Sequence, residues 1–228
     1  MQWAGLLDRR TQALSYTQAG REGDPRALAE AEIAEEYGTI DAACLRHEAA
    51  CGERARQELP PRYRRWRLSD FPEKLQERAV AFIVGDDKHT LYLHGAFGTR
   101  KTSFAAAVLI AAAATCARGV YQARFVPAYD AARDLRNLEN LAQTVEDWRG
   151  CNLLVLDDIG AQRSTPHVTE QLLLLIQCRY DCFRKTVITS NLTLEEFGER
   201  IDHRASSRFQ EGICFDLGSQ DWRKGARP

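Results

Sequence analysis

Five short apolar runs constrain the fold of this chain more than any other feature of its sequence. They lie at residues 91–93, 124–126, 153–156, 186–189 and 213–217, and helical stretches separate them. Strands that are buried on both faces need no alternation of apolar and polar residues, so such runs are typical of parallel strands with helices on both sides of the sheet. The sequence therefore predicts an α/β fold with a five-stranded parallel sheet.

A phosphate-binding motif joins the first of these runs to the helix that follows. The segment TLYLHGAFGTRKTSF places a strand before the motif and an Ala-rich helix after it, which is the context that such a loop requires. In such a loop the backbone N–H groups bind phosphate, a lysine contacts the outer phosphates and a hydroxyl group binds Mg²⁺. Lys101 and Thr102 fit the last two roles. The predicted loop comprises Gly95, Ala96, Phe97, Gly98, Thr99, Arg100, Lys101 and Thr102.

One position of the loop departs from the usual pattern. The pattern G-x-x-x-x-G-K-[ST] has a glycine immediately before the lysine, and this chain has Arg100 there. Glycine is favoured at that point because the loop passes close to phosphate, where a side chain can clash or force an unfavourable backbone angle. Three interpretations stay open: the Arg100 side chain points outward, it contacts a phosphate, or it weakens nucleotide binding.

Two adjacent carboxylates follow the apolar run at 153–156. At a strand end Asp157 and Asp158 would repel each other unless they shared a cation or a proton. In phosphate-loop proteins the first carboxylate helps to hold Mg²⁺ and the second can polarise the attacking water, so we assign Asp157 to the metal and Asp158 to the water. A strand that simply ends in solvent is the alternative.

Seven segments in this order resemble the AAA+ ATPases of the DnaC/DnaI helicase-loader and IstB transposition-helper group. They cover about residues 58–228 and are PPRYRRWRLSDF, GAFGTRKT, ARFVPAYDAARDLR, LLVLDDIG, VITSNLTLEEF, RIDHRASSRFQEG and DWR. The resemblance implies a three-layer AAA+ ATPase domain at 61–228 without a separate lid, with ATP and Mg²⁺ as ligands and hydrolysis to ADP and phosphate. It also implies that Asn191 is the sensor-1 residue, which orients the water against the γ-phosphate.

The same resemblance implies roles for arginines near the end of the chain. Arg208 lies where the family carries the arginine finger that reaches the ATP of a neighbouring subunit, with Arg204 as the fallback, and Arg223 lies where it carries the sensor-2 arginine. A helix-surface Arg208 paired with Glu211 or Asp216 is the alternative. A finger that acts on a neighbour implies head-to-tail self-association.

Residues 1–60 differ from the rest of the chain in charge and pattern. They contain 7 Arg and Lys against 11 Asp and Glu, whereas the remaining 168 residues contain 24 against 21, so the formal charges are −4 and +3. No strand pattern precedes the Pro-Pro pair at 60–61. We therefore predict a small helical N-terminal module that binds a partner.

A possible metal site lies within that module. Cys44, His47 and Cys51 form a C-x₂-H-x₃-C run on a helix expected at about 41–58. The run supplies three ligands, whereas a closed structural zinc site has four. The three residues also share one face of a helix, so a packing stripe explains them equally well.

The formal net charge of −1 excludes a uniformly basic nucleic-acid coat, so any DNA contact must come from a local patch. The best candidate is RYRRWR at 62–67, in which arginines alternate with Tyr63 and Trp66, a mixture suited to a phosphate backbone with base stacking. A charged linker whose aromatic rings pin it to the domain surface is the alternative.

Cysteine spacing and hydropathy predict a cytoplasmic location without a membrane partner. The seven cysteines lack the dense spacing of a secreted disulfide scaffold. The longest apolar stretch, at 104–114, is shorter than the ~18 residues that suggest a membrane span, and we expect it to be a buried helix.

Three functions are compatible with these features. The first is an ATP-dependent loader that delivers or opens a replicative DNA helicase on single-stranded DNA, with the N-terminal helices holding the helicase; the strand ending TSNLT favours it. The second is an IstB-type transposition helper that binds duplex DNA. The third, motivated by Arg100, is a non-catalytic adaptor with a degenerate phosphate loop.

Overall fold

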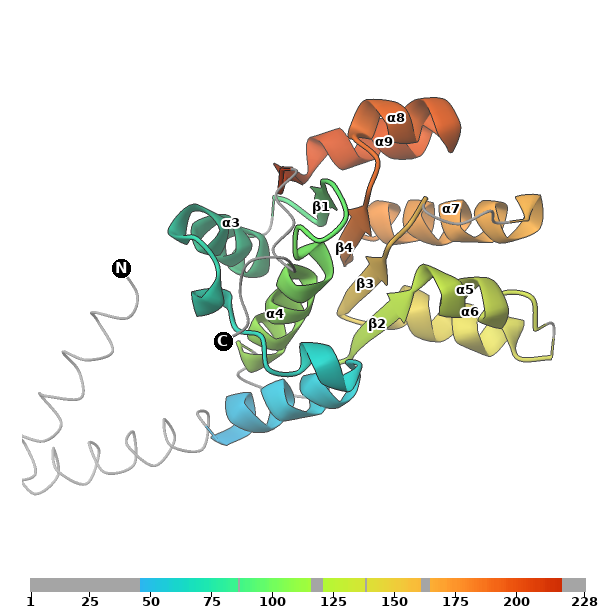
Figure 1. The fold of residues 1–228 in the computed structure, drawn as a ribbon. Helices are drawn as coiled ribbons and strands as arrows, with labels where there is room; N and C mark the ends of the chain where they lie inside the picture. Colours follow the sequence, from blue (N-terminus) through green and yellow to red (C-terminus); the bar gives the residue numbers. More distant parts are fainter. Residues whose placement is uncertain (1–45, 86, 116–120, 138, 161–164, 219–228) are drawn as a thin grey trace, which may run out of the picture. The chain divides into compact units, whose positions relative to one another are not determined.

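The computed structural model describes residues 46–85, 87–115, 121–137, 139–160 and 165–218 of the 228-residue chain. Contacts within the chain divide it into two units, one comprising 51–116 and 120–228 and the other 1–50 and 117–119. The described elements of the larger unit form an α/β fold (Figure 1).

A parallel sheet forms the middle layer of this unit. Its spatial order is β2-β3-β4-β1-β5, and all four pairs of neighbours are parallel. All five apolar runs of the sequence are strands, so the predicted sheet is confirmed. The strands are β1 (Thr90–His94), β2 (Ala123–Pro127), β3 (Leu153–Asp157), β4 (Lys185–Ser190) and β5 (Ile213–Asp216).

One face of the sheet is covered by α3 (Glu73–Val84) and α4 (Lys101–Ala114), with the short 3-10 helices η2 (Pro61–Tyr63) and η3 (Leu68–Asp70) against α4 (Figure 1). Helix α4 is the Ala-rich stretch of the sequence, and most of its side chains are buried. Small apolar side chains all around a helix let it fit between the sheet and a second layer of chain. The expectation of a buried helix at this place is therefore confirmed.

Five helices contribute to the core on the opposite face, where their apolar side chains meet Tyr92, Leu154, Leu156 and Ile188 of the sheet (Figure 1). The two faces together give the three layers expected of the fold. These helices are α5 (Ala128–Asp134), α6 (Leu141–Gly150), α7 (Pro166–Asp181), α8 (Leu194–Arg200) and α9 (His203–Glu211).

The arginine-rich segment before α3 packs its aromatic side chains against the core. Tyr63 and Trp66 are partly buried there, with ring centres 6.1 Å from Phe125 and 5.7 Å from Phe71, respectively. The Arg64 guanidinium donates a 2.9 Å hydrogen bond to the Leu59 carbonyl, so it closes the preceding turn. The rings therefore pin this segment to the domain, as the linker alternative expects.

The predicted helix at about 41–58 is described from residue 46 and continues to residue 57. Cys44 lies outside the described residues, so the C-x₂-H-x₃-C run is described only in part. Among the residues that are described, no group of three or more His, Cys, Asp or Glu side chains is placed to hold a metal ion. Within the same ranges, none of the helices has the length and apolar character needed to cross a membrane.

Candidate nucleotide-binding site

The phosphate loop connects the carboxyl end of β1 to the N-terminus of α4. The first backbone N–H groups of a helix have no partners within the helix, so they are available to bind phosphate there. Gly95 has a φ of +144°, and a Cβ atom there would lie 2.8 Å from the Gly218 carbonyl oxygen, so only glycine fits. The Ala96 N–H donates to the same oxygen at 3.0 Å, and the Thr99 hydroxyl donates to the Ala96 carbonyl at 3.0 Å. The loop is therefore tightly wound.

Lys101 lies in the centre of this loop. Its side-chain amine donates hydrogen bonds of 2.8 Å to the carbonyl oxygens of Gly95 and Ala96 and to Oδ1 of Asn191. The lysine is buried, and a buried ammonium group needs such oxygen partners to offset the loss of water. The amine therefore lies within the loop, where a bound phosphate would be.

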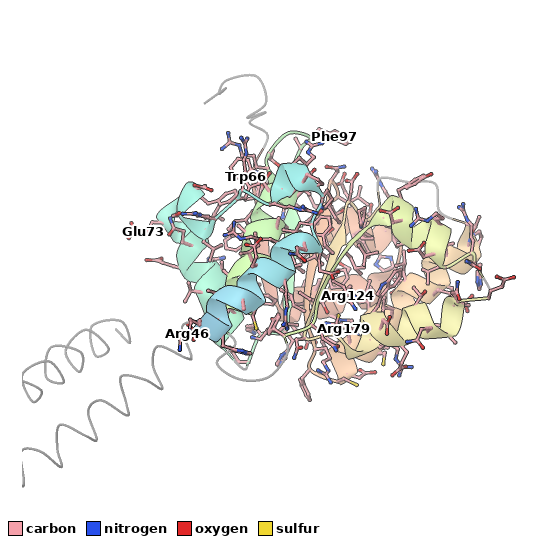
Figure 2. All side chains as sticks on the ribbon, turned by 90° about the horizontal axis from the view of Figure 1, so that it is seen from below. Arg46, Trp66, Glu73, Phe97, Arg124 and Arg179 are labelled. Carbon is pink, nitrogen blue, oxygen red and sulfur yellow. The ribbon has the colours of Figure 1, made fainter. Side chains whose placement is uncertain are left out.

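Arg100 occupies a left-handed backbone conformation, with φ 65° and ψ 23°, which is the conformation that explains why glycine is usual there. Its guanidinium carbon lies 5.1 Å from the centre of the Trp66 ring. Trp66 and the exposed Phe97 lie at the same end of the domain (Figure 2). The Arg100 side chain therefore packs on Trp66 of the arginine-rich segment.

A single hydroxyl group joins the Asp157 carboxylate at the end of β3 to the backbone N–H of Asp158. The Thr189 hydroxyl donates to Oδ1 of Asp157 at 2.7 Å, and the Asp158 N–H donates to the Thr189 oxygen at 2.8 Å. Burial raises the pKa of the Asp157 carboxyl; hydrogen bonds from Thr189 and Thr102 lower it, while the charge of Asp158 raises it further. The buried oxygen of Asp157 and the Thr102 hydroxyl are hard ligands of the kind that Mg²⁺ prefers.

Asn191 links the lysine to the second carboxylate. Its Nδ2 donates to Oδ1 of Asp158 at 3.1 Å, while its Oδ1 accepts from Lys101. Asp158 has a φ of 62°, a left-handed backbone conformation that is rare for residues other than glycine. The structure thus brings together five predicted site residues, at the adjoining ends of β3, β4 and β1: Lys101, Thr102, Asp157, Asp158 and Asn191.

Thr189 was missed by the sequence interpretation, which treated residues 186–189 as an apolar strand. Its role depends on the pairing of β3 with β4, in which Leu156 lies opposite Ile188, so that Asp157 and Thr189 follow side by side. A polar residue at the last position of the run at 186–189 was the available signal.

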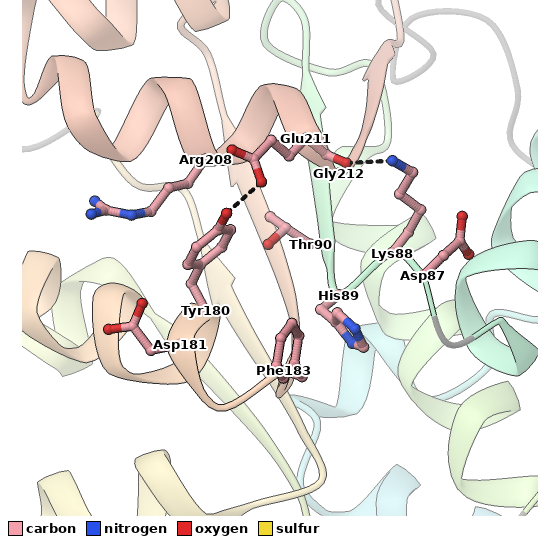
Figure 3. A pocket seen from close by; sticks show the side chains of 10 residues that line it. All are labelled: Asp87, Lys88, His89, Thr90, Tyr180, Asp181, Phe183, Arg208, Glu211 and Gly212. Carbon is pink, nitrogen blue, oxygen red and sulfur yellow. Dashed lines mark hydrogen bonds between the residues drawn. The ribbon is translucent and has the colours of Figure 1, made fainter.

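Arg208 lies away from this cluster. It is half-buried on α9 and lines a pocket together with His89 and Thr90, where β1 begins, whereas the phosphate loop follows the last residue of β1 (Figure 3). A strand of this length spans about 17 Å. Within the described part of the chain, Arg208 forms no ion pair with Glu211 or Asp216, so the surface-pair alternative is not what the structure has.

The other two predicted arginines are Arg204 and Arg223. Arg204 is exposed on α9. Arg223 lies outside the described residues.

With this geometry established, comparisons with known proteins assign the family. The family model of IstB-like ATP binding proteins matches residues 68–206, which is more than half of the chain. The chain belongs to this family. No curated protein sequence matches this IstB-like chain.

Solved structures of similar fold come from DNA replication. The IstB-like chain superposes on DnaI (TM-score 0.59, 22% identity, covering 71% of this chain and 95% of that one) and on the DnaC helicase loader (0.58, 22%, 71% and 100%). It also superposes on AMPPCP-bound DnaA from Aquifex aeolicus (0.58, 18%, 69% and 50%), so it spans only half the length of that initiator. The fold is therefore AAA+, and the chain contains an ATP-binding domain of this type.

Proposed function

We propose that this protein binds ATP with Mg²⁺ in the phosphate loop and hydrolyses it to ADP and phosphate. The observation that carries the proposal is the position of Asn191, which joins Lys101 of the loop to Asp158 at the end of the acidic strand. A phosphate-loop hydrolase needs a cation on the phosphates beside a group that activates water, and Asn191 keeps the two together.

Each side chain of the cluster then has one task. Lys101 contacts the outer phosphates, and the loop N–H groups bind the remaining phosphate oxygens. Thr102 and Asp157 would hold Mg²⁺, which neutralises charge that develops on the phosphates. Asp158 accepts a hydrogen bond from the attacking water while Asn191 orients it, so that the water oxygen bonds to the γ-phosphorus as the bond to ADP breaks.

The ATPase proposal is tested by two substitutions measured separately for binding and turnover. Lys101→Ala is expected to weaken ATP binding, and Asp158→Asn is expected to leave binding within about threefold while lowering kcat by at least about 100-fold. Titration of ATP by calorimetry and release of phosphate give the two quantities. If the wild type and both variants release phosphate at the same negligible rate, the protein is instead the non-catalytic adaptor.

The process that this ATPase serves is, we propose, loading of the replicative DNA helicase onto single-stranded DNA. Support comes from the fold, because the similar DnaI and DnaC chains are covered over nearly their whole length. The N-terminal residues 1–60 would bind the helicase, and the protein would act in the cytoplasm. A pull-down of the host replicative helicase tests this role, and absence of binding with and without ATP would contradict it.

Single-stranded DNA would bind the exposed arginines of the 62–67 segment. All four arginines of the segment are exposed, but Arg64 also donates to the Leu59 carbonyl, which leaves Arg62, Arg65 and Arg67 as the candidates. Replacing Arg62, Arg65 and Arg67 by alanine should reduce the slope of log affinity against log salt by about 2 to 3. The same change at the exposed Arg133 should leave the slope unaltered.

A transposition helper is the second candidate, favoured by the match to the IstB-like family. In that case the protein would bind duplex DNA and a transposase rather than a helicase. Parallel pull-downs against both partners, with single-stranded and duplex DNA in competition, separate the two roles.

A further inference from the structure

Arg208 and Glu211 stand three residues apart on α9, the spacing at which an arginine and a glutamate commonly pair on a helix surface. The structure has a different arrangement. The Arg208 guanidinium carbon lies 5.5 Å from the centre of the Tyr180 ring, on the neighbouring helix α7. Glu211 must therefore have another partner.

Tyr180 is that partner. Its hydroxyl group donates a hydrogen bond to Oε2 of Glu211 (Figure 3). This bond raises the pKa of Tyr180 above its ordinary value, so the hydroxyl keeps the proton that it donates. Lys88 also holds Glu211 in place. The side-chain amine of Lys88 donates a 2.7 Å hydrogen bond to the backbone carbonyl oxygen of Glu211.

A second carboxylate of the pocket that Arg208 lines is also bound by a neutral donor. Asp181 lines the same pocket, and the side-chain amide of Gln177 donates to its two oxygens at 2.6 and 2.7 Å. Two of the pocket's carboxylates are thus hydrogen-bonded to uncharged groups while the guanidinium stacks on an aromatic ring. A stacked guanidinium keeps its edge N–H donors, which suit the oxygens of a phosphate group.

We propose that Tyr180 is a positioning residue for Arg208: it binds Glu211 and stacks with Arg208, so that the guanidinium stays available to a nucleotide phosphate held by a second copy of this chain. The inference rests on the proposed ATPase function. The phosphate belongs to another copy because the pocket lies where β1 begins and the chain's own phosphate loop lies where β1 ends.

The test uses the full-length protein and a change that keeps the aromatic ring. Tyr180→Phe removes only the hydroxyl group. Because Glu211 then loses its hydrogen-bond donor, it becomes free to pair with Arg208. An exposed ion pair between Glu211 and Arg208 would then compete with the phosphate for the guanidinium. It should lower kcat for ATP hydrolysis about two- to fivefold, with little change in KM. Adding Glu211→Gln to Tyr180→Phe should restore kcat, because the neutral amide does not compete for the guanidinium. A merely structural role of Tyr180 predicts no such rescue.

Two further variants separate the failure of this inference from failure of the proposed function. Arg208→Ala should lower kcat by about 10³-fold or more, and Tyr129→Phe, the same change at an exposed tyrosine of α5, should leave it unaltered. If Arg208→Ala is inactive but Tyr180→Phe is fully active, or if Glu211→Gln gives no rescue, the positioning role is wrong. If Lys101→Ala is inactive but Arg208→Ala is not, ATP hydrolysis stands and the inference is overturned.

A readout independent of hydrolysis covers the remaining case, in which the wild type turns over no ATP. Sedimentation of the protein with and without ATP then measures self-association. We expect Arg208→Ala to lose ATP-dependent association, Tyr180→Phe to weaken it about two- to fivefold, and the double variant to recover it. Association that is the same in all forms, or independent of ATP, would overturn the inference.

Discussion

At the scale of single residues, Arg100 shows how this chain accommodates a departure from the usual phosphate-loop pattern. A left-handed conformation costs a residue with a side chain about 1 kcal/mol relative to glycine. The stacking of its guanidinium on Trp66 contributes about 0.5–1 kcal/mol in return. The two effects nearly cancel, so the loop keeps its shape without glycine.

This balance predicts different outcomes for two substitutions at Arg100. Arg100→Ala loses the stacking and keeps the strained conformation, so it should destabilise the protein by about 0.5–1 kcal/mol. Arg100→Gly loses the stacking but relieves the strain, so its free energy of unfolding should stay close to that of the wild type. Urea unfolding measures both, and calorimetry should show ATP affinity that is unchanged or higher in Arg100→Gly. A tenfold loss of affinity would mean that Arg100 is a phosphate ligand.

Asp157 gives a pH-dependent prediction. Because burial raises its pKa in the folded protein, the folded state holds this proton more tightly than the unfolded chain, whose value is about 3.9. Its contribution to stability is therefore complete below the unfolded value and is lost as the pH rises through the folded one. Without Mg²⁺, Asp157→Asn should thus stabilise the protein at neutral pH relative to the wild type, and less so in acid.

Urea unfolding of the two proteins across this pH range, without divalent cations, measures the difference. A difference that does not change with pH would show that burial of the charged carboxylate carries no cost.

At the scale of secondary-structure elements, a buried arginine joins α7 to the end of α6 and to the sheet. Arg179 of α7 is 1% exposed and donates to the carbonyl oxygens of Trp148, Cys151 and Lys185 at 2.6–3.1 Å. It thereby satisfies backbone groups at the end of α6 and the start of β4. Burial lowers the pKa of its guanidinium, yet arginine stays charged because its ordinary value is so high.

Replacing Arg179 by methionine should therefore destabilise the protein by about 3–5 kcal/mol, because several buried carbonyl groups lose their donor. The matched change at Arg133, an exposed arginine of α5, should have little effect on unfolding. Urea unfolding compares the two. Equal effects would mean that the Arg179 hydrogen bonds are not needed.

The strands were predictable and these connections were not. Each strand is encoded locally, as an apolar run whose ends the structure places within one residue. The phosphate loop and the two aspartates were also local, since each occupies a fixed place next to a strand. The contacts of Thr189, Arg179 and Tyr180 depend on strand order and helix packing, which bring together residues up to 32 positions apart.

At the scale of the whole molecule, the phosphate loop and Arg208 lie at opposite ends of β1. If Arg208 acts on a nucleotide, as we propose, that nucleotide would belong to a second copy, and a complete site would comprise two copies arranged head to tail. Nucleotide binding, self-association and hydrolysis are expected to depend on one another for this reason. The same dependence would let a partner bound to residues 1–60 control turnover through assembly.

ATP hydrolysis by a mixture of two inactive variants tests this central claim most directly. Lys101→Ala keeps Arg208 but has a defective phosphate loop, and Arg208→Ala has the reverse. Each alone should be inactive, and an equal mixture should recover about a quarter of the wild-type rate, because about one interface in four combines an intact loop with an intact arginine. A mixture that stays as inactive as its folded components would contradict a site shared between two copies.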